Sequence, residues 1–246
     1  MRDILLYYSN IFKGNTYNIH KALINNHDID YLKIDQLKKQ YNDLKINYVT
    51  MLDEEYPKIL LHYKYPPYVL YYKGDLKLLK QTSLLLISEN KTADSYLDLA
   101  KDKFDENISL IILDYVPHIK KISESFENPK LIFVKVTPLS FINDWDDKNL
   151  YISQYPITTH PKKEYFAEHI KVAAAISDAL IIMGSEQKYK TINLANVFLD
   201  FDKQVYCFPS NNLDDANNYL LDNGASLVTN FSKIINIKNN PLSQVI

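Results

Sequence analysis

Between residues 179 and 225 the chain alternates continuous apolar runs with stretches of helical spacing. The apolar runs are ALIIMG and QVYCFP, and the amphipathic stretches are TINLANVFL and NNYLLDNGA. A strand that is apolar along its whole length is typical of a sheet covered on both faces. The pattern therefore predicts a doubly wound α/β sheet. Such sheets bind ligands outside the carboxyl ends of their strands, here the loop 184–190 and the turn after Cys207.

The rest of the chain extends this pattern. Residues 1–48 show the spacing of short helices, and strands alternate with helices from residue 49 onward. The expected strands are 68–74, 83–88, 108–113, 131–136, 151–155, 179–183 and 204–208. The expected helices are 92–104, 115–126, 163–177, 189–200 and 214–222, with a further helix over 53–63 capped by Asp53. We expect a small helical domain over 1–48, an α/β domain over 49–237 and a polar tail over 238–246.

Glycine and arginine are scarce. The chain has four glycines, where average usage would give about seventeen, and its only arginine is Arg2. Glycine loops let backbone N–H groups approach a phosphate, and the arginine fork binds it with two hydrogen bonds. Neither G-x-G-x-x-G nor G-x-x-x-x-G-K-[ST] occurs. A nucleotide-dependent enzyme is therefore disfavoured, and we expect no cofactor.

Charge and cysteine content exclude other classes. The net charge of −2 provides no general attraction to nucleic acid or anionic lipid, so such binding requires a local patch. Cys207 is the single cysteine and lies in an apolar run, which excludes a disulfide framework and a cysteine metal site. The start of the chain does not have the pattern of a secretory signal, and no apolar run reaches the length of a membrane span. We expect a cytoplasmic protein without membrane contact.

Catalytic and metal-binding arrangements find little support. Asp114 and His118 have helical spacing, but Pro117 interrupts the helix that would align them, and no third metal ligand follows. Ser185 has no evident base and does not lie in a G-x-S-x-G elbow. We therefore predict neither a catalytic residue nor a metal site.

Several motifs occur together in one order along the chain. They are Tyr56-Pro57, PPYVLYYKG (66–74), YISQYP (151–156), FAEHIKVAAAISDALIIM (166–183), EQKYKTINLA (186–195), FPS (208–210) and ANNYLLDNGASLV (216–228). Over about residues 50–230 the chain resembles the DNA-processing protein A (DprA/Smf) family. The resemblance implies a Rossmann-like doubly wound, mostly parallel sheet preceded by a small helical domain.

The chain departs from this family in the loops that bind DNA. The family's Val-Gly-x-Arg-x-x-Ser turn is ISENKTA (87–93) here, and its Arg-Asn-Arg triplet becomes His169, Ile170 and Lys171. The Ser-Gly-Ser anion nest becomes Glu186, Gln187 and Lys188. These changes predict weakened or altered DNA affinity.

The resemblance implies a recombination mediator rather than an enzyme. Such a protein binds single-stranded DNA during natural transformation, helps to load a RecA-type recombinase and acts as a homodimer. The candidate DNA-binding residues are His169, Lys171, Lys188, Tyr189, Lys190, Asn218, Lys162 and Lys163. An alternative for each lysine is a solvated surface charge, and this alternative is favoured for Lys162 and Lys163.

Two other functions remain open on the sequence. One is a degenerate dimeric scaffold that keeps the fold but has lost DNA binding. The other is a Rossmann-like nucleotide-processing enzyme of the lysine-decarboxylase-like phosphoribohydrolase group. That group has a Pro-Gly-Gly-x-Gly-Thr-x-x-Glu loop, which this chain lacks.

Overall fold

The computed structural model describes residues 1–89, 91–100, 107–113, 124, 126, 128–163, 165–186, 188–212, 215–231 and 234. The chain divides into two compact units. The first unit comprises residues 1–76 and 133–172, and the second comprises residues 77–132 and 173–246. The domain boundaries expected near residues 48 and 237 stay predictions.

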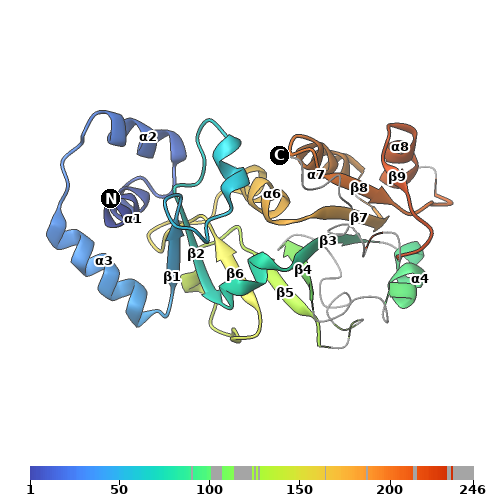
Figure 1. The fold of residues 1–246 in the computed structure, drawn as a ribbon, viewed down its shortest axis with the longest axis horizontal. Helices are drawn as coiled ribbons and strands as arrows, with labels where there is room; N and C mark the ends of the chain where they lie inside the picture. The colour runs from blue at the N-terminus through green and yellow to red at the C-terminus, as the bar shows by residue number, and fades with distance from the viewer. Residues whose placement is uncertain are drawn as a thin grey trace. The chain divides into compact units, whose positions relative to one another are not determined.

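Three helices open the first unit and confirm the helical spacing of the N-terminal segment. They are α1 (Arg2–Ile11), α2 (Thr16–Ile24) and α3 (Tyr31–Asp43), drawn in blue in Figure 1. Asn15 and Asp30 cap α2 and α3 by accepting hydrogen bonds from backbone N–H groups three residues on. The apolar faces of the helices share one core with buried side chains of β2, including Val69 and Tyr71.

The strands of the first unit are antiparallel. They are β1 (Asn47–Thr50), β2 (Val69–Gly74) and β6 (Leu150–Ser153), with β2 between the other two. Two short 3-10 helices, Lys58–His62 and Leu139–Phe141, belong to the same unit. The apolar runs predicted β2 and β6 but not β1. They did not predict the antiparallel direction, because periodicity does not report which strands become neighbours.

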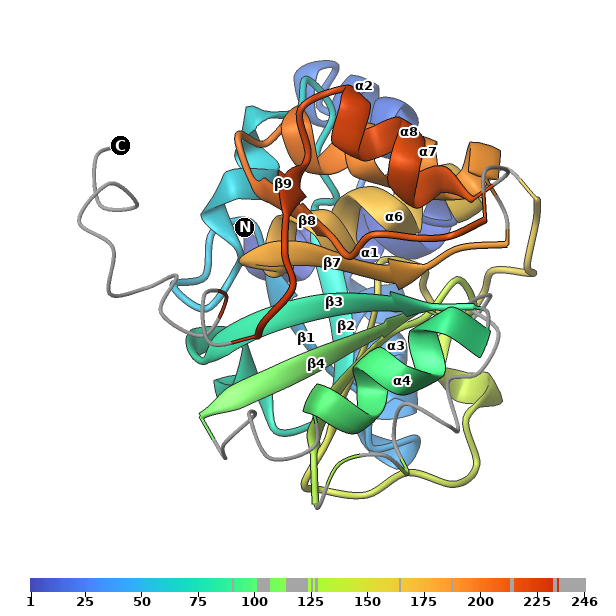
Figure 2. The same ribbon diagram turned by 90° about the vertical axis from the view of Figure 1, so that its right-hand side faces the viewer.

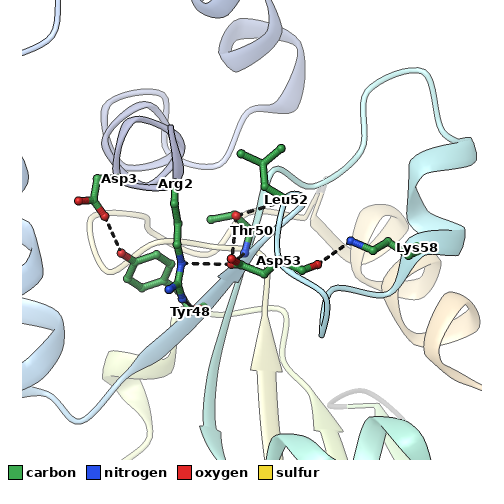
Figure 3. Close-up of polar contacts among 7 residues, drawn as sticks. All are labelled: Arg2, Asp3, Tyr48, Thr50, Leu52, Asp53 and Lys58. Atoms are coloured by element: carbon green, nitrogen blue, oxygen red, sulfur yellow. Dashed lines mark hydrogen bonds and ion pairs between the residues drawn. The ribbon is translucent and has the colours of Figure 1, made fainter.

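The helix predicted over 53–63 is wrong. Pro57 has no N–H to donate, and only Lys58–His62 forms a 3-10 helix. Asp53 instead closes the turn after β1, where its Oδ2 accepts a hydrogen bond from Thr50 N (2.7 Å) and pairs with Arg2 Nε (3.1 Å), as Figure 3 shows. The Arg2 guanidinium also donates to Tyr48 O and lies over the Tyr48 ring. The single arginine thus joins α1 to this turn.

The second unit contains the parallel sheet that the apolar runs predicted. Its strand order is β4 (Ile108–Leu113), β3 (Thr82–Ser88), β7 (Ala179–Gly184), β8 (Gln204–Cys207) and β9 (Ser226–Leu227). Each neighbouring pair is parallel. Every residue of β4 and β7 is buried, as expected for strands covered on both faces. A further strand, β5 (Lys130–Val134), contains the boundary between the two units.

Helices cover both faces of the parallel strands. Figure 2 shows α4 (Lys91–Ala100) on one side of β3 and β7, and α7 (Lys188–Leu199) with α8 (Ala216–Asp222) on the other. The doubly wound prediction is therefore confirmed. The helix predicted over 115–126 lies outside the described residues, apart from 124 and 126. Among the helices of the described ranges, none has the length and apolar character needed to span a bilayer.

Gly224 ends α8 with a positive φ of +97°, and a Cβ built there would meet no atom within 4 Å. We expect Gly224→Val to lower the free energy of unfolding by about 1–2 kcal/mol through backbone strain alone. Thermal unfolding measured beside oligonucleotide binding checks this. A fully stable Gly224→Val protein that had lost binding would show that the turn contacts ligand.

Candidate nucleic-acid interface

The strand order of the second unit reverses between β3 and β7, where a doubly wound sheet usually binds its ligand. Glu89 directly follows β3 and occupies this position with 3% of its surface exposed. Its Oε2 accepts hydrogen bonds from Glu186 N (3.1 Å) and Ser185 Oγ (3.3 Å), both just beyond β7. The carboxylate therefore binds donors that a ligand phosphate would otherwise use.

A second carboxylate, Asp215, lies at the same strand ends and is 1% exposed. It accepts hydrogen bonds from Ser185 N (3.1 Å), Asn217 N (3.1 Å) and Ser210 Oγ (3.1 Å). The backbone N–H groups of Ser185 and Glu186 are thus both bonded to carboxylates of the protein itself. Two buried negative charges disfavour a phosphate at this edge. The loop 184–190 was predicted as a ligand site, and its first residues are not arranged to bind an anion.

The predicted DNA-binding residues of the second unit have different roles. Asn218 is half-buried, and its Nδ2 donates to Ser210 O (2.8 Å) and Asn212 O (3.4 Å), so its amide holds the turn after β8. Tyr189, in the first turn of α7, is 84% exposed, and Lys190 is also exposed. The side chain of Lys188 lies outside the described residues. Asn218 therefore has a structural role and its DNA contact stays a prediction, whereas Tyr189 and Lys190 are accessible.

Asn217 is a residue whose role the sequence did not indicate. It is fully buried, and its Nδ2 donates to Ile182 O (3.2 Å) and Phe208 O (2.8 Å). Ile182 lies near the end of β7 and Phe208 directly follows β8, so one amide joins the two strands near their carboxyl ends. Its neighbour Asn218 matched the family motif and received the functional interpretation instead.

The first unit contains a cleft of about 630 Å³. Residues far apart in sequence form its walls: the turn between α1 and α2, the segment 63–67, the end of β6 and the first turns of α6 (Tyr165–Ile176). We call it the lysine–tyrosine cleft after the residue types that dominate its lining. The lysines are Lys13, Lys64, Lys162 and Lys171, and the tyrosines are Tyr17, Tyr63, Tyr65, Tyr155 and Tyr165. Of the described lining residues, Glu168 is the one carboxylate.

Two predicted residues, Lys162 and Lys171, line this cleft. Lys162 is exposed just before α6, where its carbonyl accepts a hydrogen bond from Tyr165 N (3.1 Å). Lys171 pairs with Glu168 (2.9 Å) and lies 5.2 Å from the centre of the Tyr63 ring. Lys163 is exposed next to Lys162 but is not part of the cleft lining. The cleft thus combines positive charge with aromatic rings, the combination that binds single-stranded nucleic acid.

His169 does not lie on the cleft surface. Its side chain is 1% exposed, and its Nδ1 is 2.8 Å from Phe166 O in the preceding turn of α6. The expected phosphate contact of His169 therefore needs correction, because a buried ring cannot reach a bound strand while α6 keeps this conformation. Matching a family motif placed the residue correctly on the helix but did not report which face it occupies.

Two tyrosines of the cleft lining, Tyr155 and Tyr165, are held in place by their neighbours. The rings of Tyr155 and Tyr165 stack with centres 4.0 Å apart, and Gln154 Nε2 donates to Tyr155 Oη (2.9 Å). Burial raises the pKa of Tyr155 above its ordinary value, so its phenol stays neutral at physiological pH. The positive charge of the cleft comes from its lysines. Among all the residues that the structure describes, no group of three histidine, cysteine or acidic side chains could hold a metal ion.

The doubly wound, parallel sheet of the second unit defines a Rossmann-like α/β protein. At its glycine-poor strand ends, the protein's own carboxylates occupy the position where such a sheet usually binds a ligand. Within that class, residues 47–108 and 137–239 match the family described as DNA recombination-mediator protein A. The chain belongs to this family.

Individual relatives agree with this membership. The chain is 22% identical over 209 residues to the DNA processing protein DprA of Bacillus subtilis (strain 168), covering 78% of this chain and 70% of the relative. It shares its fold with DNA processing protein A from Streptococcus pneumoniae at a TM-score of 0.70 and 17% identity, covering 94% of this chain and 95% of the other. DNA processing protein A from Helicobacter pylori, a structure that addresses single-stranded DNA binding, matches at a TM-score of 0.65 and 23% identity, over 78% and 96% of the two chains.

Proposed function

We propose that this protein is a recombination mediator that binds single-stranded DNA through lysines, without catalysing a reaction. Family membership provides the role, and the lysine–tyrosine cleft is the single observation that supports a surviving DNA site. The chain has an overall charge of −2, yet four lysines line one cleft against one glutamate. A cleft with this local excess of positive charge attracts a polyanion even when the whole protein does not.

The physiological setting that we propose is natural transformation, in which the protein passes incoming single strands to a RecA-type recombinase. We also propose that it works as a homodimer. Exposed apolar side chains on α7 and α8, Leu199 (56% exposed) and Tyr219 (45% exposed), support an interface on these helices. Light scattering of the unaltered protein beside Leu199→Lys tests the dimer, and a monomer at all concentrations would contradict it.

Titration of a fluorescent oligonucleotide tests DNA binding directly. Lysine contacts are point charges that release counterions, so we expect weak binding, preference for single over double strands and loss of affinity as salt rises. An affinity that did not change between low and physiological salt would contradict a lysine-based site. Absence of binding at low salt would favour the scaffold alternative, in which fold and dimer remain without DNA.

The double variant Lys162→Glu/Lys171→Glu should lower single-strand affinity at low salt by more than tenfold. It should also reduce the slope of log affinity against log salt by roughly 1.4, since each phosphate contact on a single strand contributes about 0.7. Lys33→Glu/Lys39→Glu, on exposed positions of α3 in the same unit, is the charge-matched control. Equal affinities for the two double variants would remove Lys162 and Lys171 from the site.

A further inference from the structure

The turn between α1 and α2 is built to hold one position against the cleft. Lys13 and Gly14 both have positive φ, +53° and +74°. A Cβ on Gly14 would come within 3.2 Å of Gln154 O and of Pro156 Cδ, so the backbone of the turn packs directly on the segment after β6. Asn15 then caps α2 through Asn18 N (2.9 Å). The exposed Lys13 side chain is therefore presented at the cleft by a backbone with little freedom to move.

Two tyrosines on the same wall are held by their neighbours. The rings of Tyr17 and Tyr65 pack edge to face, with centres 5.3 Å apart and an interplanar angle of 78°. His20 packs on Tyr65 at 5.1 Å. Lys21 Nζ lies 4.6 Å from the Tyr17 ring centre, and Lys64 Nζ lies 5.3 Å from that of Tyr65. Tyr17 nevertheless remains 44% exposed, which leaves area for a ligand.

We propose that the N-terminal helical segment forms one wall of the single-stranded DNA site. Lys13 and Lys64 neutralise phosphates of the strand, and Tyr17 and Tyr65 stack on its bases. The proposal rests on the DNA binding proposed above. It adds Lys13 and Tyr17, which precede the family match that begins at residue 47, and joins them to Lys64 and Tyr65 within that match. The N-terminal helices would then contribute to ligand binding as well as to the fold.

The chemistry of the wall selects the ligand. Lysines without an arginine fork bind phosphates without fixing their geometry, and tyrosine faces accept any base, so the site suits a strand of any sequence. Bases of a duplex are paired and stacked on one another, which withdraws their faces from these rings. The carboxylates of an acidic peptide would pair with the lysines but would not stack on the tyrosine rings. The combination of the two residue types therefore favours single-stranded nucleic acid.

The test separates stacking from charge. Tyr17→Leu/Tyr65→Leu keeps apolar bulk but removes both ring faces, and Tyr17→Phe/Tyr65→Phe keeps the faces. Loss of stacking on one base costs about 1–3 kcal/mol, or roughly 5- to 150-fold in affinity. We expect the leucine variant to bind an oligothymidine at least 5-fold more weakly and the phenylalanine variant to bind it nearly normally. On an abasic strand of the same length, the leucine variant and the unaltered protein should bind alike.

Charge on this wall is tested by Lys13→Glu/Lys64→Glu, which should weaken binding of both strands. Tyr31→Leu, at a position on α3 that is 67% exposed and not part of the cleft lining, is the control for loss of a surface tyrosine. A photoreactive thymine strand bound to the unaltered protein should crosslink to a peptide containing residues 12–18 or 63–67. This readout does not depend on how any variant folds.

The outcomes distinguish this proposal from the one on which it rests. If the unaltered protein binds the oligonucleotide but neither the leucine variant nor Lys13→Glu/Lys64→Glu differs from Tyr31→Leu, the strand lies elsewhere and this wall is not part of the site. Crosslinks confined to α6 or to the second unit would lead to the same conclusion. If the unaltered protein does not bind at low salt, both proposals are overturned.

Discussion

The free energy of unfolding of Asp215→Ala is expected to be at least about 3 kcal/mol lower than that of the unaltered protein. The carboxylate is 1% exposed and accepts hydrogen bonds from two backbone N–H groups and the Ser210 hydroxyl. Each buried donor that loses its partner costs roughly 1–3 kcal/mol, and alanine leaves three of them. One of the three bonds, from Asn217 N, is the side-chain cap of α8, because Asp215 is the N-cap residue of that helix. Urea unfolding followed by circular dichroism measures the change.

Two variants control for this result. Asp200→Ala, at an exposed position just after α7, should change the free energy of unfolding by less than about 0.5 kcal/mol. Asp215→Asn keeps an acceptor oxygen of similar shape and should fall between the two alanine variants. Should Asp215→Ala prove as stable as Asp200→Ala, the carboxylate would not be an essential acceptor at the strand ends.

The network around Asp215 and Glu89 shows which features of the second unit the sequence predicted and which it did not. The apolar runs predicted the parallel strands and the helices on both sides, because burial on two faces is directly visible in composition. They also predicted which loops follow the carboxyl ends of the strands, where a doubly wound sheet usually binds its ligand. They did not indicate that Glu89 and Asp215, 126 positions apart in the numbering of the chain, would bond the same Ser185 there. That outcome depends on tertiary contacts between loops.

The first unit shows a similar limit. Lys171 was identified through a motif match and Lys162 as a charged residue ahead of the same helix, and both line the cleft. Lys13, Tyr17, Lys64 and Tyr65 were missed, because the segments that carry them meet only when the chain folds. The pattern that accompanies them, lysine next to or near tyrosine in KGNTY and YKY, is not distinctive in a chain with 20 tyrosines. Local sequence patterns predicted most helices and strands, whereas the cleft depends on which of these become neighbours in the fold.

Because of buried tyrosines in the first unit, stability should change with pH in the alkaline range. Tyr41 and Tyr71 stack with centres 5.1 Å apart, and their hydroxyls donate to Asn10 Oδ1 (3.0 Å) and Ser9 Oγ (2.9 Å). Burial raises the pKa of Tyr41 from 10.0 to about 12, and it raises the pKa of Tyr71 well above the ordinary value. A deprotonated phenol in this cluster would be a negative charge without water around it.

One lysine, Lys203, has the opposite effect on the free energy of unfolding at lower pH. Lys203 lies in the second unit, where its ammonium donates to Ala174 O (2.7 Å), Ala175 O (2.6 Å) and Ser177 O. Burial lowers its pKa from 10.5 to about 8. Between these values the unfolded chain binds the proton more tightly, so this lysine makes stability rise with pH. Its contribution is complete above its ordinary pKa. From there upward the buried tyrosines lower stability as pH rises, and so does the Cys207 thiol, whose pKa burial raises to about 12.

We therefore expect the free energy of unfolding to fall steeply between about pH 10.5 and 12. In this range the unfolded chain has lost the tyrosine protons that the folded chain retains, so each unit of pH costs about 1.4 kcal/mol for each such tyrosine. Tyr41 and Tyr71 together should cost about 4 kcal/mol by pH 12. Denaturant unfolding at a series of pH values, with tyrosinate absorbance as the second signal, measures the slope.

Tyr41→Phe should reduce that slope by about 1.4 kcal/mol per pH unit, because one proton no longer distinguishes the folded from the unfolded chain. At neutral pH the same variant should be less stable by about 1–2 kcal/mol, since Asn10 Oδ1 loses its donor and Ile157 N loses an acceptor at 3.2 Å. Tyr31→Phe, with a ring that is 67% exposed, should leave both the slope and the stability unchanged. If Tyr41→Phe and the unaltered protein showed the same alkaline slope, Tyr41 would titrate alike in the folded and unfolded chains and would not be a source of the pH dependence.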